Sequence, residues 1–148
     1  MYLGIDYGRV RIGLALGRVL PQGTGVLNSR LPLKEIIERI GEIVSKNDVE
    51  GIVLGLPTRN QGEAGTLVPE IQSFAQKIAE ELSIPVFFEE EKFSSAEAEM
   101  ILSQSEKKYP RSSGKVDELA AILILEQFLG RLKEDQNIIP DINAGSRK

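Results

Sequence analysis

The sequence of 148 residues contains no histidine, no cysteine and no tryptophan. Without imidazole and thiol groups the chain cannot build a Ser-His-Asp triad, a thiol nucleophile, a Cys/His zinc site or a disulfide. Carboxylate chemistry remains, because Mg²⁺ and Mn²⁺ prefer oxygen ligands and can activate water themselves. If the protein is an enzyme, its acidic residues are therefore the first candidates for catalysis.

Long apolar runs are also missing from the chain. The longest lies around residues 120–125, which is far shorter than the ~20 residues that cross a bilayer. The N-terminus lacks the basic segment and the apolar stretch of a signal peptide. We therefore expect a cytoplasmic protein that does not bind membranes.

The length and composition favour one globular domain. Single domains usually have ~100–200 residues, and this chain has 148. Its 41% hydrophobic and 27% charged residues are ordinary for a soluble folded protein. Pro140 and Gly145 follow the last helical pattern. We predict one domain over residues 1–133 and a flexible tail over residues 134–148.

Apolar patterning predicts an alternation of strands and helices along the chain. The expected strands cover residues 2–7, 11–16, 23–29, 51–55 and 84–88, and the expected helices cover residues 33–47, 67–82, 94–102 and 115–132. The first two strands should form a hairpin, whereas right-handed crossovers place the later strands parallel to the first. This order predicts an α/β fold with a mixed five-stranded sheet and helices on both faces.

Asp6 is the first candidate for chemistry because it ends the first strand, in the segment I-D-Y-G-R-V-R. An Asp two residues before a glycine is also common in ordinary β-turns. However, a carboxylate on a buried central strand is costly unless it is paired or binds a metal. Gly8 would let a ligand approach the backbone, and Arg9 and Arg11 would supply positive charge for a phosphate.

Further acidic residues end the last strand and begin the last helix. Glu89, Glu90 and Glu91 follow the last strand, where an acidic run is most often simply solvated. Strand alternation would place Glu89 and Glu91 on one side and Glu90 on the other. Asp117 lies in the first helical turn, where the helix dipole alone favours acidic residues. Because that helix is apolar over much of its circumference, we expect Asp117 to point into the structure.

Four motifs resemble the YqgF family of pre-16S rRNA nucleases, which are related to Holliday junction resolvases. The motifs are L-G-I-D-Y-G-R-V-R-I-G-L-A at 3–15, V-L-G-L-P at 53–57, F-E-E-E-K-F-S-S-A-E-A at 88–98 and K-V-D-E-L-A-A-I-L-I-L-E-Q-F-L at 115–129. The resemblance covers about residues 2–129 and implies an RNase H-like fold. It also implies a metal-dependent nuclease in which Asp6, Glu91 and Asp117 bind Mg²⁺ or Mn²⁺ and carry out catalysis.

The third motif departs from the family pattern Asp-Glu-Arg-Leu-Thr-Thr. Lys92 replaces the usual Arg, and Ser94 and Ser95 replace the two Thr. Positive charge and hydroxyl groups are kept by these replacements. A lysine nevertheless cannot bind a phosphate through two parallel hydrogen bonds as an arginine can, so the contact of Lys92 with the substrate should differ.

Basic residues form a candidate clamp for a nucleic-acid backbone. The net charge of −4 argues mildly against non-specific binding of nucleic acid by the whole surface. A local basic face is still compatible with this charge, because most of these residues lie on expected loops near the acidic end. The candidate contacts to nucleic acid are Arg9, Arg11, Arg59, Lys92, Lys107, Lys108, Arg111 and Lys115.

The family resemblance implies a nuclease that matures the 5′ end of pre-16S rRNA in ribosome biogenesis, on RNA or on a ribosomal precursor particle. Three alternatives stay open. A Holliday junction resolvase would cut branched DNA as a homodimer, whereas an RNA-processing nuclease can act as a monomer. A non-catalytic RNA-binding assembly factor could keep the same fold. A kinase of the actin and sugar-kinase superfamily shares the opening Asp-x-Gly hairpin, but normally needs two such domains.

Overall fold

The computed structural model describes residues 1–57, 67–91 and 115–138. Five strands form one sheet in the order β3-β2-β1-β4-β5. The strands are β1 (Tyr2–Tyr7), β2 (Arg11–Gly17), β3 (Gln22–Asn28), β4 (Gly51–Leu56) and β5 (Val86–Glu90), and the helices are α1 (Leu33–Lys46), α2 (Val68–Leu82) and α4 (Lys115–Ile138).

The sheet is mixed. β1 pairs antiparallel with β2 and parallel with β4, β2 pairs antiparallel with β3, and β4 pairs parallel with β5. The carboxyl ends of the parallel strands β1, β4 and β5 therefore meet at one edge of the sheet, as parallel strands require. The mixed five-stranded sheet that the sequence predicts is confirmed.

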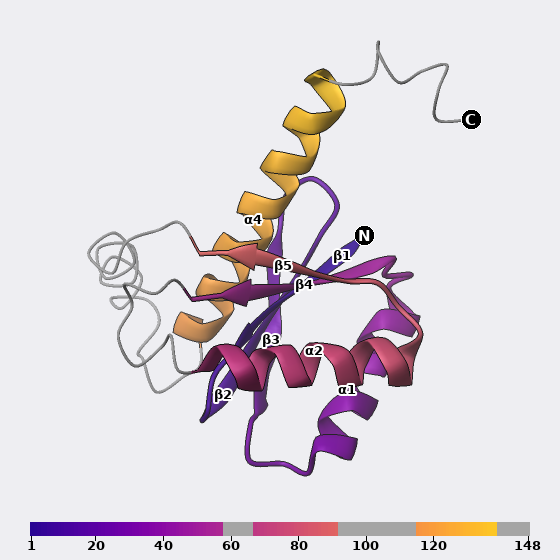
Figure 1. The fold of residues 1–148 in the computed structure, drawn as a ribbon, viewed down its shortest axis with the longest axis vertical. Helices are drawn as coiled ribbons and strands as arrows, with labels where there is room; N and C mark the ends of the chain where they lie inside the picture. Colours follow the sequence, from indigo (N-terminus) through magenta and orange to yellow (C-terminus); the bar gives the residue numbers. More distant parts are fainter. Residues whose placement is uncertain (58–66, 92–114, 139–148) are drawn as a thin grey trace.

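Helices cover both faces of the sheet (Figure 1). On one face, α1 and α2 pack on the aliphatic side chains of β1, β2 and β4, with Ile40 and Ile78 fully buried. On the other face, α4 contacts all five strands, and its Ile124 and Leu125 are fully buried. Truncating such a residue to alanine costs about 2–5 kcal/mol, so both layers contribute strongly to stability.

Glycine lets α4 lie close to the sheet. A Cβ added to Gly4 of β1 would lie 2.8 Å from Leu125 Cβ and 3.0 Å from the Ala121 carbonyl oxygen. Real Cβ atoms do not approach other atoms at such distances, so any side chain here would push the helix outward. Gly4 of β1 thereby lets the N-terminal half of α4 lie directly on the central strands.

Two elements differ from the sequence prediction by more than one residue at an end, whereas the other described elements agree with it to within one residue. β5 covers Val86–Glu90 instead of 84–88, because Glu89 finds partners on α4 that allow an acidic residue to stay in the sheet. α4 continues to Ile138 instead of ending near residue 132, because no proline occurs between Lys115 and Pro140. The helix predicted over residues 94–102 lies outside the described residues. None of the described helices is long and apolar enough to span a membrane.

Candidate active site

Asp6 lies near the end of the central strand β1, on the face that α4 covers. Gly4 contacts α4, and residues two apart on a strand share a face. Directly across from Asp6 on β2 is Gly13, which leaves room for the backbone of Asp117. The turn after β1 is held in place because the Ser29 hydroxyl donates a hydrogen bond to the Gly8 carbonyl. Asp6 is thus fixed between the sheet and the start of α4.

The environment of Asp6 strongly favours its protonated form. Burial, followed by the charges of Glu91 and Asp117, raises the pKa of Asp6 from its ordinary value of 3.8 to about 8. Burial disfavours the charged carboxylate, and each neighbouring carboxylate adds repulsion. The three acidic residues proposed from the sequence motifs therefore interact electrostatically in the fold.

Glu91 directly follows β5 and extends its pairing with β4. Its backbone N–H donates a hydrogen bond of 3.0 Å to the Leu56 carbonyl. A Cβ added to Gly55 would lie 3.3 Å from Glu91 Oε2 and 2.4 Å from Ile124 Cδ1. Gly55 therefore leaves space for both the Glu91 carboxylate and α4. The alternation expected for the acidic run is observed, since Glu89 also faces α4 whereas Glu90 is exposed.

Asp117 sits in the first turn of α4 and forms an ion pair across to β2. Arg11 Nε donates a hydrogen bond of 2.8 Å to Asp117 Oδ2. The side chain of Asp117 is only 25% exposed, in agreement with the expectation that it points into the structure. This contact joins the N-terminus of α4 to the start of β2.

Glu118 is a buried acidic residue that the sequence motifs do not single out. It is 8% exposed, and the Gly25 N–H donates a hydrogen bond of 2.6 Å to its Oε2. The ladder between β2 and β3 shifts between Leu14 and Ala15, and Gly25 adopts a φ of +117° that glycine tolerates. This bulge turns a backbone donor toward α4, so Glu118 fastens the helix beside Asp117.

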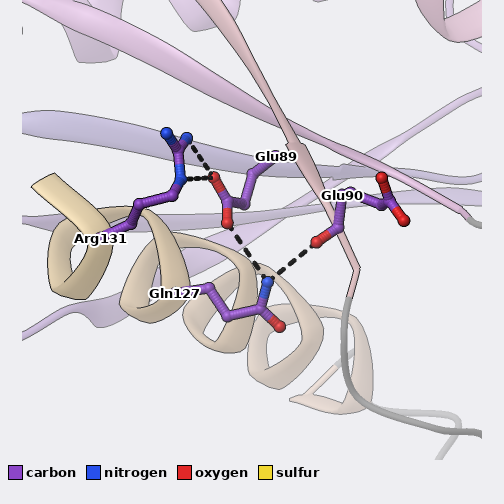
Figure 2. Close-up of polar contacts among 4 residues, drawn as sticks. All are labelled: Glu89, Glu90, Gln127 and Arg131. Atoms are coloured by element: carbon purple, nitrogen blue, oxygen red, sulfur yellow. Dashed lines mark hydrogen bonds and ion pairs between the residues drawn. The ribbon is translucent and has the colours of Figure 1, made fainter.

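A second polar cluster, formed by Glu89, Glu90, Gln127 and Arg131, joins β5 to α4 (Figure 2). Glu89 is only 3% exposed. Its Oε1 accepts hydrogen bonds of 2.6 Å and 3.2 Å from Arg131. Glu89 is therefore not part of a solvated acidic run. The sequence pattern of α4 did not single out Gln127 and Arg131, because Glu126 and Lys133 are also polar in the same stretch of the helix.

The acidic residues fit a hard divalent cation by their chemistry. Asp6, Glu91 and Asp117 offer only oxygen donors, and a cation would relieve the repulsion that raises the pKa of Asp6. Within residues 1–57, 67–91 and 115–138, no three acidic side chains are already close enough to form a metal-binding cluster. Asp117 is held by Arg11, so it would have to exchange this ion pair for a metal.

The basic residues expected to bind nucleic acid are placed only in part. Arg9 Nη2 lies 3.2 Å from Glu70 Oε1 in an exposed ion pair, and Arg11 is paired with Asp117. Lys115 is the first residue of α4, two residues before Asp117 in the same helical turn. The remaining candidates, Arg59, Lys92, Lys107, Lys108 and Arg111, lie outside the described residues.

The likeness to solved structures concerns the fold. A structure titled "T. thermophilus RuvC in complex with Holliday junction substrate" matches with a TM-score of 0.55 and 19% identity, covering 88% of this chain and 95% of that chain. A second Thermus thermophilus RuvC structure matches with a TM-score of 0.52 and 21% identity. The mixed sheet with helices on both faces is therefore an RNase H-like fold.

Sequence relatives match the chain over most of its length. The protein of Syntrophomonas wolfei subsp. wolfei named "Putative pre-16S rRNA nuclease" is 36% identical over 138 residues, which cover 90% of this chain and 97% of that protein. A protein of the same name from Synechocystis sp. is 35% identical, covering 86% of this chain and 85% of that protein. Residues 1–131 match the family model described as "RuvX: Holliday junction resolvase". The chain therefore belongs to the RuvX family, as its YqgF-like motifs indicate.

Proposed function

We propose that this protein is a divalent-metal-dependent nuclease that hydrolyses phosphodiester bonds in precursor 16S rRNA. The observation that carries the proposal is the electrostatic coupling of three carboxylates at one edge of the sheet. Burial raises the pKa of Asp6 most, and the charges of Glu91 and Asp117 raise it further. Three acidic groups that repel one another are costly in a structural core and useful where a cation binds.

Asp6, Glu91 and Asp117 would hold the cation, which is Mg²⁺ or Mn²⁺ in this proposal. A divalent ion held there would polarise the scissile phosphate and lower the pKa of an attacking water. Asp6 would contribute a carboxylate from a central strand of the sheet. Asp117 would have to give up its contact with Arg11 to bind the ion. The Arg11 guanidinium would then be available for a phosphate oxygen of the substrate.

The substrate assignment rests on the relatives. Proteins 33–36% identical to this chain carry a name that assigns them to pre-16S rRNA, and this favours RNA. A second candidate function is cleavage of branched DNA, which the description of the family as Holliday junction resolvases favours. We place RNA first because the relatives cover nearly the whole chain and share its length.

The test is incubation of the purified protein with two substrates of matched length. One is a precursor 16S rRNA fragment and the other is a four-way DNA junction, each with Mg²⁺, Mn²⁺ or EDTA. Cleavage of the RNA with metal and not with EDTA is the expected result. Cleavage of the junction alone would establish the second function. Binding of RNA without cleavage under any condition would identify an assembly factor instead.

A further inference from the structure

The polar cluster between β5 and α4 acts on the peptide unit that precedes Glu91. Gln127 Nε2 donates a hydrogen bond of 2.9 Å to the Glu90 carbonyl oxygen. The N–H of the same peptide unit, which belongs to Glu91, donates to the Leu56 carbonyl at 3.0 Å. The peptide between Glu90 and Glu91 is therefore held from β4 on one side and from α4 on the other. Figure 2 shows the contact from α4.

This arrangement is specific to the sheet edge. Within the described residues β5 is the last strand of the sheet, so no strand among them pairs with the backbone groups of β5 that point away from β4. Gln127 supplies a donor to one of these groups at the point where the strand ends. Fixing both sides of one peptide restricts its rotation, and this determines the direction in which the next side chain, Glu91, leaves the backbone.

Glu89 and Arg131 hold the Gln127 amide in place. Glu89 Oε2 lies 3.4 Å from Gln127 Nε2, and Glu89 Oε1 accepts both hydrogen bonds from Arg131. The Arg131 guanidinium also lies 5.6 Å from the centre of the Phe128 ring. The amide is thus oriented by a carboxylate that is itself fixed by an ion pair.

Helix docking does not require this polar cluster. Phe128 packs on Phe87 with ring centroids 5.4 Å apart and on Tyr2 at 5.2 Å. These aromatic contacts already bury the same stretch of α4 on the sheet. Glu89 is buried whereas the Arg131 side chain is 47% exposed, and an ion pair of a buried carboxylate adds little net stability compared with apolar residues of similar size. The cluster therefore calls for a role other than holding the helix on the sheet.

The cluster connects two of the acidic residues of the candidate site. Asp117 and Gln127 lie on the same helix α4, separated along its axis by about 15 Å. Because the helix is rigid, fixing β5 to Gln127 also fixes Glu91 relative to Asp117. We propose that Gln127, oriented by Glu89 and Arg131, is a positioning residue that orients the Glu91 carboxylate for metal binding. This inference rests on the proposed metal site.

The test compares Gln127→Leu and Gln127→Lys with the wild type. The probe is Mn²⁺ alone, titrated while the thermal unfolding midpoint is recorded, and kcat and KM are measured on the precursor RNA fragment. Outer-shell partners of metal ligands typically change metal affinity 10–100-fold. For Gln127→Leu we expect the Mn²⁺ concentration for half-maximal stabilisation to rise about 10-fold, with kcat lowered and KM unchanged. Gln127→Lys keeps a donor and should recover most of the loss.

A purely structural role predicts a different pattern. The Gln127 hydrogen bond to Glu90 is exposed to solvent, so water replaces the lost donor and the metal-free unfolding midpoint should stay near that of the wild type. A lowered midpoint of unfolding with unchanged Mn²⁺ response and kcat would overturn the proposal. The control is Arg39→Leu, which removes the exposed 2.9 Å ion pair with Glu35 on α1 and should leave the Mn²⁺ response unchanged.

Removing Arg131 alone would leave the buried Glu89 carboxylate without its ion pair and would destabilise the fold for that reason. The second test is therefore the double variant Glu89→Leu with Arg131→Leu. The double variant should unfold at the same temperature as the wild type without metal. It should still require a higher Mn²⁺ concentration than the wild type for half-maximal stabilisation. If the double variant and Gln127→Leu both respond to Mn²⁺ as the wild type does, the positioning role is overturned and the proposed metal site is not. A wild type that Mn²⁺ does not stabilise would overturn the metal site and this inference together.

Discussion

A Cβ atom added to Gly13 would lie 2.0 Å from the backbone carbonyl oxygen of Asp117. Gly13 is also the residue paired with Asp6 across β1 and β2. One glycine therefore sets the distance between the strand that carries Asp6 and the helix that carries Asp117. The arrangement of the candidate site depends on a close backbone contact as well as on the acidic side chains.

We predict that Gly13→Ala displaces the start of α4 and lowers cleavage roughly 100-fold, because small misplacements of catalytic groups cost about this much. Overpacking should also destabilise the fold by about 1–3 kcal/mol. Cleavage rates and thermal unfolding measure the two effects. The matched control is Gly130→Ala on α4, where an added Cβ meets no atom within 4 Å. Equal activity of the two variants would show that this contact does not position the site.

Arg11 should weaken metal binding while it is paired with Asp117. Its Nε lies 2.8 Å from Asp117 Oδ2, so its positive charge competes with a cation. We predict that Arg11→Gln lowers the Mn²⁺ concentration needed for thermal stabilisation and raises KM for RNA, since a phosphate contact is lost. Because the pair is partly exposed, the loss of stability should be below about 1 kcal/mol. A higher Mn²⁺ requirement in this variant would contradict the competition.

The raised pKa of Asp6 predicts a specific dependence of stability on pH in metal-free protein. The folded state keeps the Asp6 proton up to about pH 8, whereas an unfolded chain loses it near its ordinary pKa of 3.8. The folded state therefore binds more protons between these values, and its stability falls as the pH rises through this range. Metal should bind more tightly toward pH 8, because it competes with this proton.

Thermal unfolding in EDTA at pH 5 and at pH 8.5 tests this dependence. Asp6→Asn should lose less stability than the wild type over this interval, since Asn does not titrate. About 1 kcal/mol corresponds to about 2–4 °C in the unfolding midpoint of a protein of this size. Parallel pH curves for the two proteins would show that Asp6 is not a strained carboxylate.

Glu91 and Glu90 should differ in their effect on metal binding. The Glu91 carboxylate lies over Gly55 on the α4 face, whereas Glu90 is exposed. We predict that Glu91→Gln abolishes cleavage and raises the Mn²⁺ concentration for stabilisation, while Glu90→Gln keeps most of the activity. Metal titrations followed by thermal unfolding give the comparison. Equal losses in both variants would indicate a diffuse acidic patch, and loss only in Glu90→Gln would place the metal ligand one residue earlier.

The sheet order could be predicted from the sequence because its signals are local. The Ile, Leu and Leu that alternate along β2 and the continuous apolar run of β4 each indicate a strand within a few residues. Asp6 and Asp117 could be chosen as candidates for a similar reason, because each lies where an apolar element begins or ends. These features require no knowledge of what the element packs against.

The remaining features depend on partners that are distant in sequence. Glu89 belongs to β5 only because Arg131, 42 residues later, neutralises its charge, and no local pattern reveals that pair. The same holds for Glu118, whose acceptor role depends on the bulge at Gly25, 93 residues earlier. The sequence predicts that Arg11 contacts a phosphate. Its ion pair with Asp117 could not be predicted, because the two residues come together only in the folded chain.

The most direct test of a metal-dependent site built on Asp6 is a cleavage rate. Asp6→Asn and the wild type are measured in parallel on a precursor 16S rRNA fragment at a saturating Mn²⁺ concentration. Asn keeps the shape of Asp6 and removes the charge that would hold the cation, so the variant should fold normally. Cleavage is predicted to fall to the level seen with EDTA, while the unfolding midpoint without metal stays equal to or above that of the wild type. Cleavage by Asp6→Asn at the wild-type rate would contradict a metal-dependent site built on Asp6.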